Sequence, residues 1–197
     1  MKYNESIKDI LKKNNGIITS TICNEHKIPH VYLTRMVKNN MLIRLERGIY
    51  GDNTGNYDDY YFFQVRFNKC VFSYQSALYF HGLTDLVPFQ KEVTLYKGYN
   101  PHTIPSDVLV HFANRNIYEL GIVEIETQFG NHIKIYDKEK TICDVIKSRK
   151  DMDVEIFKKA IKKYLEYEDK DINRLYQYAE QLGIVKEVND IVEVLYE

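Results

Sequence analysis

Two sets of residues have types and spacings that could support catalysis. Ser73, His81 and Asp85 are the residue types of a hydrolase triad, while Asp151 and Asp153 have the spacing of a nucleotidyltransferase metal pair. Neither set has the sequence context that its chemistry needs. No G-x-S-x-G turn surrounds the serine, and aspartates just before a helix cap its free amides. The sequence therefore predicts no catalytic residues.

Metal ions and cofactors are not predicted either. The six histidines show no H-E-x-x-H spacing, and the one pair four residues apart, His26 and His30, spans a predicted turn. Cys23, Cys70 and Cys143 are far apart and odd in number, which argues against a disulfide framework and a zinc finger. No glycine-rich phosphate loop occurs. The cysteine content is typical of a reducing compartment, and we expect a cytoplasmic protein.

The charge is unevenly distributed, although the 197 residues sum to −1. Residues 1–50 carry nine Lys and Arg against four Asp and Glu, whereas residues 51–136 carry six against nine and residues 137–197 carry twelve against fifteen. A basic first quarter is expected of a small nucleic-acid-binding module beside a neutral or acidic domain. No apolar run is long enough for a membrane span or a signal-peptide core, so no membrane contact is predicted.

The first fifty residues show the pattern of a winged helix-turn-helix. Apolar spacing predicts helices at about 3–13, 20–26 and 30–39, with residues 17–18 as a short apolar link. Residues 41–50 alternate in the manner of a two-stranded ribbon and carry two arginines. Three short helices and a basic ribbon predict a DNA-binding domain over residues 1–52.

The third helix is the predicted DNA reader. Leu33, Met36 and Val37 share one side and should pack inward, which leaves Arg35 free to meet base edges in the major groove. Lys38 and the ribbon arginines suit phosphate contacts. The predicted DNA-binding residues are His30, Val31, Tyr32, Thr34, Arg35, Lys38, Asn39, Arg44 and Arg47. Because winged helices also dock proteins, that alternative remains open.

The rest of the chain predicts a second domain over residues 57–197. Two helices, at about 58–67 and 73–82, precede four strand candidates that form a small, mostly antiparallel sheet over about 92–136. The remaining residues, about 137–197, show helical periodicity. The predicted fold class is α+β.

A lysine-rich surface is predicted in the helical end. It is either a solvated helix face or a contact surface for an acidic partner or a nucleic acid. The candidate partner-binding residues are Lys147, Arg149, Lys150, Lys158, Lys159, Lys162 and Lys163.

Three segments resemble the AbiEi-type antitoxins. They are R-L-E-R-G-I-Y at 44–50, S-Y-Q-S-A-L-Y-F-H-G-L-T-D at 73–85 and D-K-E-K-T-I-C-D-V-I at 137–146. Together they span nearly the whole chain in the order of that family. One departure is Lys140, where the family commonly has arginine, and it puts little in doubt.

The resemblance implies an antitoxin of a bacterial abortive-infection toxin–antitoxin system. In such proteins the winged helix represses the operon by binding inverted repeats in double-stranded promoter DNA. The C-terminal domain is needed to neutralise a nucleotidyltransferase-like toxin encoded beside it. Within the two later segments, Leu78, Leu83 and Ile142 are expected in the core, and Asp85 and Asp144 as caps or hydrogen-bond partners.

Two alternatives remain. One is a winged-helix regulator whose C-terminal domain senses a ligand or forms a dimer. The other is a metal-dependent nucleotidyltransferase or nuclease that uses Asp151 and Asp153.

Overall fold

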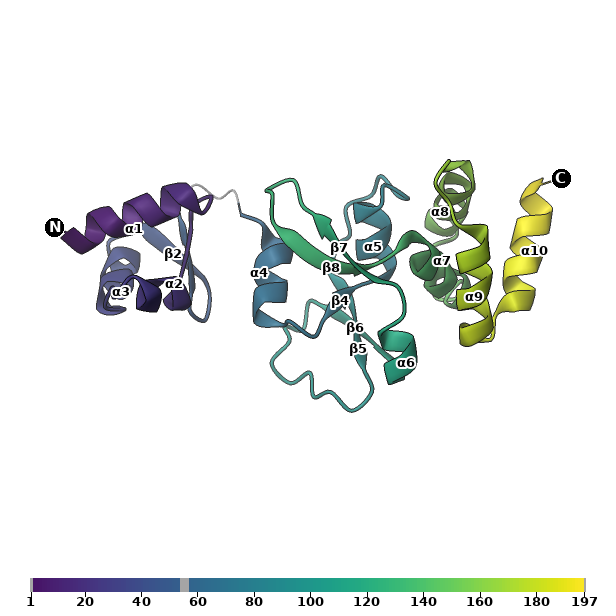
Figure 1. Ribbon diagram of the computed structural model, residues 1–197, viewed down its shortest axis with the longest axis horizontal. Coiled ribbons are helices and arrows are strands. Elements are labelled where there is room, and N and C mark those ends of the chain that lie inside the picture. The colour runs from purple at the N-terminus through teal and green to yellow at the C-terminus, as the bar shows by residue number, and fades with distance from the viewer. Residues whose placement is uncertain (1, 54–56, 197) are drawn as a thin grey trace. The chain divides into compact units, whose positions relative to one another are not determined.

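The computed structural model describes residues 2–53 and 57–196 (Figure 1). The chain divides into two compact units, of which the first comprises the residues up to Val65 together with Glu126–Asn131. The second comprises Arg66–Ile125 and the residues from His132 onward. Helices and strands are both abundant, and the predicted α+β fold class is confirmed.

The first unit contains four helices and a three-stranded sheet among its described residues. The elements are α1 (Lys2–Lys13), β1 (Ile17–Thr19), α2 (Ser20–Glu25), α3 (Val31–Lys38), β2 (Leu42–Glu46), β3 (Ile49–Asp52) and α4 (Asp59–Arg66), the last residue of which lies in the second unit. The predicted link at 17–18 is wrong: it is strand β1, which pairs antiparallel with β3 and gives the order β1-β3-β2. The order of helices and strands is that expected of a winged helix-turn-helix.

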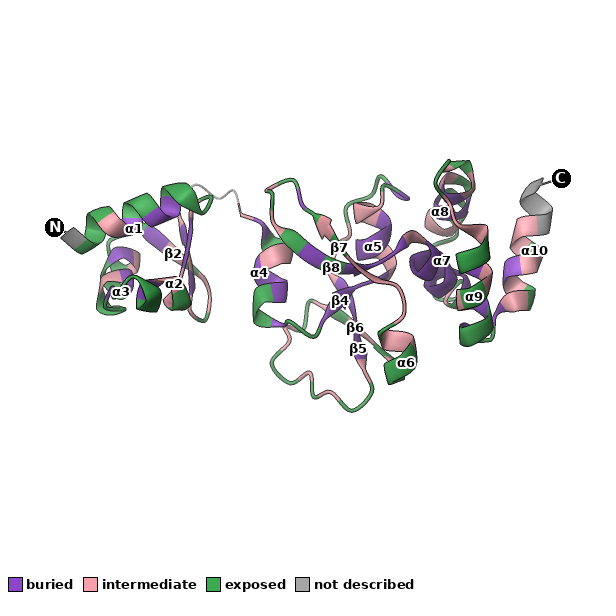
Figure 2. Ribbon diagram, in the orientation of Figure 1, coloured by how far each residue is buried: buried purple, intermediate pink, exposed green. Residues whose placement is uncertain are grey.

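The core of this unit follows the helical spacing. Ile7, Ile10 and Leu11 of α1 are buried and pack with Leu33 and Met36 of α3 (Figure 2). Helix α1 ends where Asn15 and Gly16 adopt positive φ angles of 47° and 82°. At Gly16 a Cβ atom would lie within 3 Å of the Asp52 carboxylate, so this turn requires glycine.

Asp58 is a buried carboxylate just before α4. It accepts hydrogen bonds from the backbone N–H of Tyr61 (3.0 Å), from the amide of Asn131 (3.0 Å) and from the hydroxyl of Thr127. The first bond satisfies a free amide at the start of α4. The other two attach the segment 126–131 to the first unit, since a buried carboxylate needs such partners.

The second unit contains a five-stranded sheet with helices around it. Its elements are β4 (Val71–Phe72), α5 (Tyr74–Phe80), β5 (Glu92–Tyr96), β6 (Leu109–Ala113), α6 (Arg115–Tyr118), β7 (Ile122–Glu126), β8 (His132–Tyr136), α7 (Lys138–Lys147), α8 (Val154–Glu166), α9 (Ile172–Leu182) and α10 (Val185–Tyr196). The sheet order is β6-β5-β4-β8-β7.

The prediction of a mostly antiparallel sheet is wrong for this unit, because the sheet is mixed. Strands β4 and β5 are antiparallel, but β5 pairs with β6 and β4 pairs with β8 in parallel. The chain between the parallel strands β5 and β6 is a loop. Of these two parallel pairs, only that of β4 and β8 joins distant parts of the chain, and alternation within a strand reveals neither that pairing nor the parallel direction of β6 beside β5.

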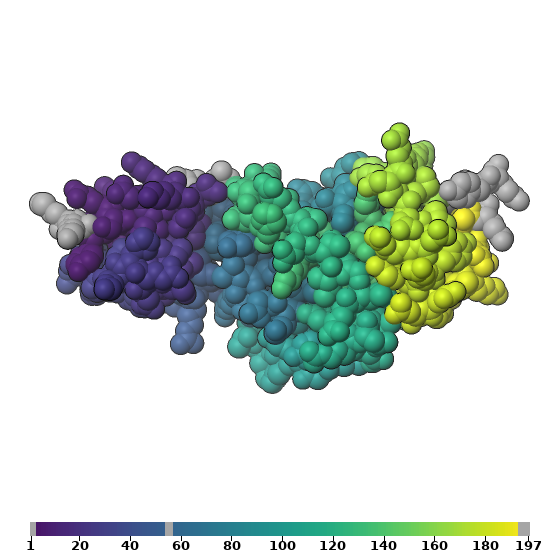
Figure 3. All heavy atoms as spheres, viewed as in Figure 1, coloured from purple at the N-terminus to yellow at the C-terminus, as the bar shows by residue number. Residues whose placement is uncertain are grey.

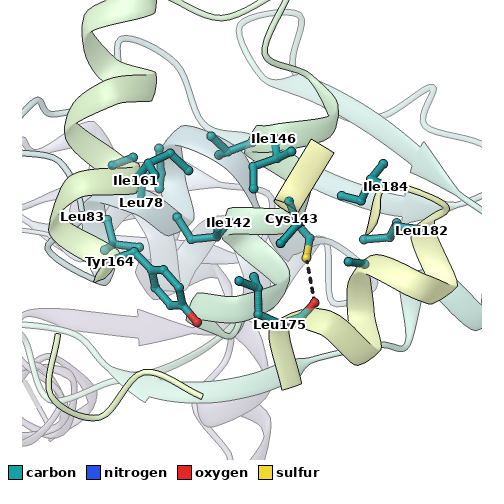
Figure 4. Close-up of a cluster of buried hydrophobic side chains, with 14 residues drawn as sticks. Leu78, Leu83, Ile142, Cys143, Ile146, Ile161, Tyr164, Leu175, Leu182 and Ile184 are labelled. Atoms are coloured by element: carbon teal, nitrogen blue, oxygen red, sulfur yellow. Dashed lines mark hydrogen bonds between the residues drawn. The ribbon is translucent and has the colours of Figure 1, made fainter. Parts of the chain in front are cut away.

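A helical core anchors the end of this unit. Leu78, Leu83 and Ile142 are buried in it, as predicted. Figure 4 shows these side chains around α7, where the thiol of Cys143 donates to the carbonyl oxygen of Leu175 at 3.5 Å. Burial raises the pKa of the Cys143 thiol to about 12, so the cysteine is held in its neutral form.

The predicted domains, residues 1–52 for DNA binding and residues 57–197 for antitoxin activity, stay a prediction. Residues 54–56 of the predicted boundary lie outside the described residues. Over the described part of the chain, no helix has the length and apolar character needed to cross a membrane.

Candidate nucleic-acid interface

Helix α3 separates an apolar side from an exposed polar side. Leu33 and Met36 are at most 3% exposed and lie in the core. Val31, which is 49% exposed, faces solvent together with Arg35. The exposed residues of α3 and its C-cap are Val31, Thr34, Arg35, Lys38 and Asn39, while Tyr32 is half-buried. The helical wheel thus predicted the exposure of this surface correctly, except that Val37 is only half-buried.

The first turn of α3 is held by side chains from neighbouring elements. A ring nitrogen of His30 lies 2.8 Å from the side-chain oxygen of Asn24, which joins the ends of α2 and α3. The ring of Tyr32 lies 4.9 Å from that of Tyr3 on α1, and the Arg35 guanidinium lies 5.7 Å from the centre of the Tyr32 ring. These contacts orient Arg35 without using its hydrogen-bond donors.

The ribbon of β2 and β3 places two arginines in solvent beside a tight turn. Arg44 and Arg47 are exposed, and Gly48 between the strands has a φ of 81°. The register of the two strands shifts between Arg44 and Glu46, which marks a bulge. The Nε of Arg44 donates to the carbonyl oxygen of Glu46 at 3.4 Å, a weak bond that leaves its other donors available.

The charge of this surface is mainly positive. Helix α3 has no acidic residue, and Glu46 is the one acidic residue of β2. Figure 3 shows the side chains of the N-terminal segment in purple and dark blue. The structure thus brings together on α3 and the ribbon the nine residues predicted to bind DNA, on a surface that suits a polyanion. Whether they contact DNA stays a prediction.

The predicted lysine surface is divided between two places. Lys147 ends α7 and donates to the carbonyl oxygen of Leu182 (3.2 Å), the last residue of α9. Arg149 and Lys150 follow it and are exposed. The four residues on α8 are Lys158, Lys159, Lys162 and Lys163.

Two of the α8 lysines are engaged in ion pairs with one acid. Lys159 and Lys163 both bind the carboxylate of Asp85, Lys163 at 2.6 Å. The hydrogen bond from Lys159, followed by that from Lys163, lowers the pKa of Asp85 to about 2. Lys162 lies 3.9 Å from Glu166. Much of the positive charge is therefore compensated within the unit.

The residue types of a hydrolase triad are not brought together. Ser73 occupies the N-cap position of α5, but its hydroxyl accepts from Thr94 (2.9 Å) instead of capping the helix. His81 lies 2.7 Å from the carbonyl oxygen of Tyr136, and burial lowers its pKa. Asp85 binds the two lysines. Each residue has a separate structural partner.

The possible metal pair is also used structurally. Asp153 caps α8 by accepting from the backbone N–H of Glu155 (2.8 Å) and of Ile156 (3.2 Å). Asp151 is exposed at the end of the preceding turn. Within the described ranges, no group of three His, Cys, Asp or Glu side chains could hold a metal ion.

The second and third sequence segments meet in a buried polar cluster that sequence reasoning missed. Ser76 accepts from the backbone N–H of Glu92 (2.8 Å), and the Glu92 carboxylate lies 3.1 Å from His111. The His111 ring stacks at 3.8 Å on Tyr74, a non-glycine residue with a φ of 47°. The alternating pattern of the strands gave no signal for these long-range partners.

The same cluster contains an ion pair inside α7. Both carboxylate oxygens of Asp144 accept from Lys140, at 2.6 and 2.7 Å, and the two side chains are 7% and 2% exposed. Burial raises the pKa of Asp144, and the Lys140 ammonium opposes that shift. Asp144 is an internal hydrogen-bond partner, as predicted, and Lys140 is the donor.

Residues 5–51 match a family model described as the AbiEi antitoxin transcriptional regulators. No match to the chain is found among curated proteins. The family match begins in α1 and ends in β3, so it covers the helices and the ribbon of the N-terminal segment. The predicted resemblance to AbiEi-type antitoxins is confirmed by this match, and it rests on the segment that carries the basic surface.

Proposed function

We propose that this protein is the antitoxin of an abortive-infection toxin–antitoxin pair and the repressor of its own operon. Its N-terminal segment binds inverted repeats in the promoter, and its C-terminal part neutralises a nucleotidyltransferase-like toxin. The proposed function is non-enzymatic, serves defence against phage and belongs to the cytoplasm. The observation that carries it is the exposed, mainly positive surface of α3 and the ribbon, within the segment matched to antitoxin regulators.

The proposed DNA contacts follow from side-chain chemistry. Helix α3 enters the major groove, where Arg35 donates two hydrogen bonds to guanine and the exposed Val31 meets a thymine methyl group. Arg44 and Arg47 on the ribbon contact phosphates, as does Lys38. Phosphate contacts set the register of the protein, and the base contact gives the preference for sequence.

Fluorescence anisotropy tests the DNA-binding part. The full chain is titrated against a duplex of its own upstream DNA and against a scrambled duplex, each at two salt concentrations. We expect tighter binding to the upstream duplex and a steep loss of affinity with salt, because phosphate contacts release counterions. Equal weak binding to both duplexes would assign this module to protein docking instead.

Co-expression tests the antitoxin part. The neighbouring gene is induced alone and together with this chain. Growth arrest that this chain relieves supports the proposal. A neighbour without toxicity, or arrest that the chain does not relieve, leaves a winged-helix regulator without antitoxin activity.

A further inference from the structure

The loop between α5 and β5 holds apolar side chains in solvent. Leu86 is 57% exposed, Val87 is 69% exposed and Phe89 is fully exposed at 102%. In Figure 1 this loop lies above α5 beside α8, and in Figure 2 much of it is coloured as exposed. Exposed apolar residues scattered singly are ordinary, but a run of them in one loop is typical of an interaction surface.

The start of this loop is anchored to α8. The Asp85 carboxylate accepts from Lys159 and Lys163, and Lys163 also donates to the carbonyl oxygen of Gly82 at 3.1 Å. The hydroxyl of Thr84 accepts from the backbone N–H of Leu86 at 3.2 Å. These bonds hold the residues just before the apolar run against α8.

A groove lies next to the loop along the first turns of α8. Its volume is about 620 Å³, and its apolar lining comes from Leu86 and Ile156. Val154, at the start of α8, is a further apolar side chain at 58% exposure. An exposed aromatic side chain and an apolar groove thus occur on the same surface of the unit.

Charges of both signs surround the groove. Lys158 and Lys162 lie on its edge, and so do Asp153 and Glu155. A surface for nucleic acid or for a uniformly acidic partner would be mainly positive. A mixed surface is complementary to itself when a two-fold axis sets the lysines of one molecule against the acids of another.

We propose that the loop Leu86–Phe89 and the groove beside α8 form a two-fold interface between two copies of this chain. In such an interface each Phe89 enters the groove of the other copy, so both apolar features are covered by one symmetric contact. This interface rests on the proposed function for its biological role. A two-fold dimer presents two recognition helices to an inverted repeat.

Sedimentation equilibrium of the full chain measures this association without DNA or toxin. Between roughly 1 and 100 µM we expect the mass to rise from 23.4 kDa towards about 47 kDa. Phe89→Ser should raise the dimer Kd at least 100-fold and should not perturb the fold, because the side chain has no contacts to lose in the monomer. Circular dichroism checks the fold.

Phe112→Ser is the matched control. Phe112 is 45% exposed on β6, an edge strand of the same unit, and lies outside the proposed interface. We expect this variant to associate as the wild type does. A wild-type chain that stays monomeric throughout, a Phe89→Ser dimer of unchanged Kd, or an equal loss in Phe112→Ser would each overturn the proposal.

A charge exchange tests the groove. Lys158→Glu and Glu155→Lys should each weaken the dimer about tenfold, since each gives the two copies like charges, and an equimolar mixture of the two variants should recover the loss. Unchanged Kd values in both variants would contradict the self-complementary groove.

DNA binding by the same variants separates the two proposals. Phe89→Ser should keep the affinity for a single half-site and lose cooperative binding to two. A dimer that binds no upstream DNA would refute the proposed function and leave the interface standing. A wild-type chain that stays monomeric but binds its upstream DNA would refute the interface and support the proposed function.

Discussion

The two basic surfaces of the molecule differ in how far their charges are already engaged. On α3 and the ribbon, Arg35 and Arg47 are exposed and no acid of the same helix opposes Arg35. On α8, Lys159 and Lys163 are bound to Asp85. The two surfaces have similar numbers of Lys and Arg in the sequence. The difference teaches that a basic stretch indicates a polyanion partner only where the folded chain leaves its charges available.

The largest expected effect is the loss of the buried ion pair of α7. Asp144→Ala leaves the Lys140 ammonium buried without its partner, which should lower the free energy of unfolding by about 3–5 kcal/mol. Urea denaturation measures it. Replacing both residues, as in Lys140→Met with Asp144→Leu, should cost much less. If the single and double variants are equally unstable, the pair is not the reason for the instability.

The next largest effect is a loss of DNA affinity when the exposed charges of α3 are removed. Arg35→Ala should weaken operator binding by about 1–3 kcal/mol and relax the preference for sequence, because it removes a base contact. Lys38→Ala should weaken all sequences about equally and lower the salt slope by about one. Anisotropy titrations measure both. Unchanged operator affinity in Arg35→Ala would mean that another element reads the DNA.

A smaller effect is expected at the cap of α2. The hydroxyl of Thr19 accepts from the backbone N–H of Ile22 at 3.1 Å, so Thr19→Ala should cost about 1 kcal/mol of stability. Thermal unfolding measures the loss. Thr19→Ser, which keeps the hydroxyl, is the control and should lose less than Thr19→Ala. An equal loss of stability in both variants would assign the effect to the methyl group of Thr19 instead of its hydroxyl.

The smallest effect is a pH dependence in the second unit. Burial lowers the pKa of His81 below its ordinary value of 6.5, so the folded chain resists a proton that the unfolded chain takes up. The stabilising contribution is therefore present above pH 6.5 and decreases as the pH falls below it. His81→Gln keeps a side-chain donor for the Tyr136 carbonyl and removes the titration. Between pH 7.5 and pH 5.5, the free energy of unfolding should fall less in His81→Gln than in the wild type, as measured by denaturation at both pH values. Equal falls in the two proteins would exclude His81 as the titrating group.

Local elements were predictable, whereas long-range pairing was not. The helices were predicted within a residue or two of α1, α2 and α3, because their apolar spacing and turns lie within a few residues. Strands β1 and β4 have three and two residues, too few for an alternating pattern. Their existence depends on partners that lie elsewhere in the chain.

The same limit applies to the surfaces. The exposed side of α3 could be predicted from the spacing of apolar and polar residues within the helix itself. The neutralisation of Lys163 could not, because Asp85 lies 78 residues away in the sequence. The exposure of Leu86, Val87 and Phe89 was missed for a related reason, since whether apolar side chains are covered depends on partners elsewhere in the chain.

The partners of Asp58 decide where the chain can be cut. A fragment that ends at Val65 keeps this carboxylate but loses the hydroxyl of Thr127 and the amide of Asn131. The Asp58 carboxylate would then lack two of the hydrogen bonds that it accepts in the intact chain. A fragment that ends at Asn53 omits Asp58 and retains every strand of the three-stranded sheet. The shorter fragment in turn loses Phe62, which packs with Ile17 and Ile49 in the intact chain, so each product exposes a group that the intact chain covers.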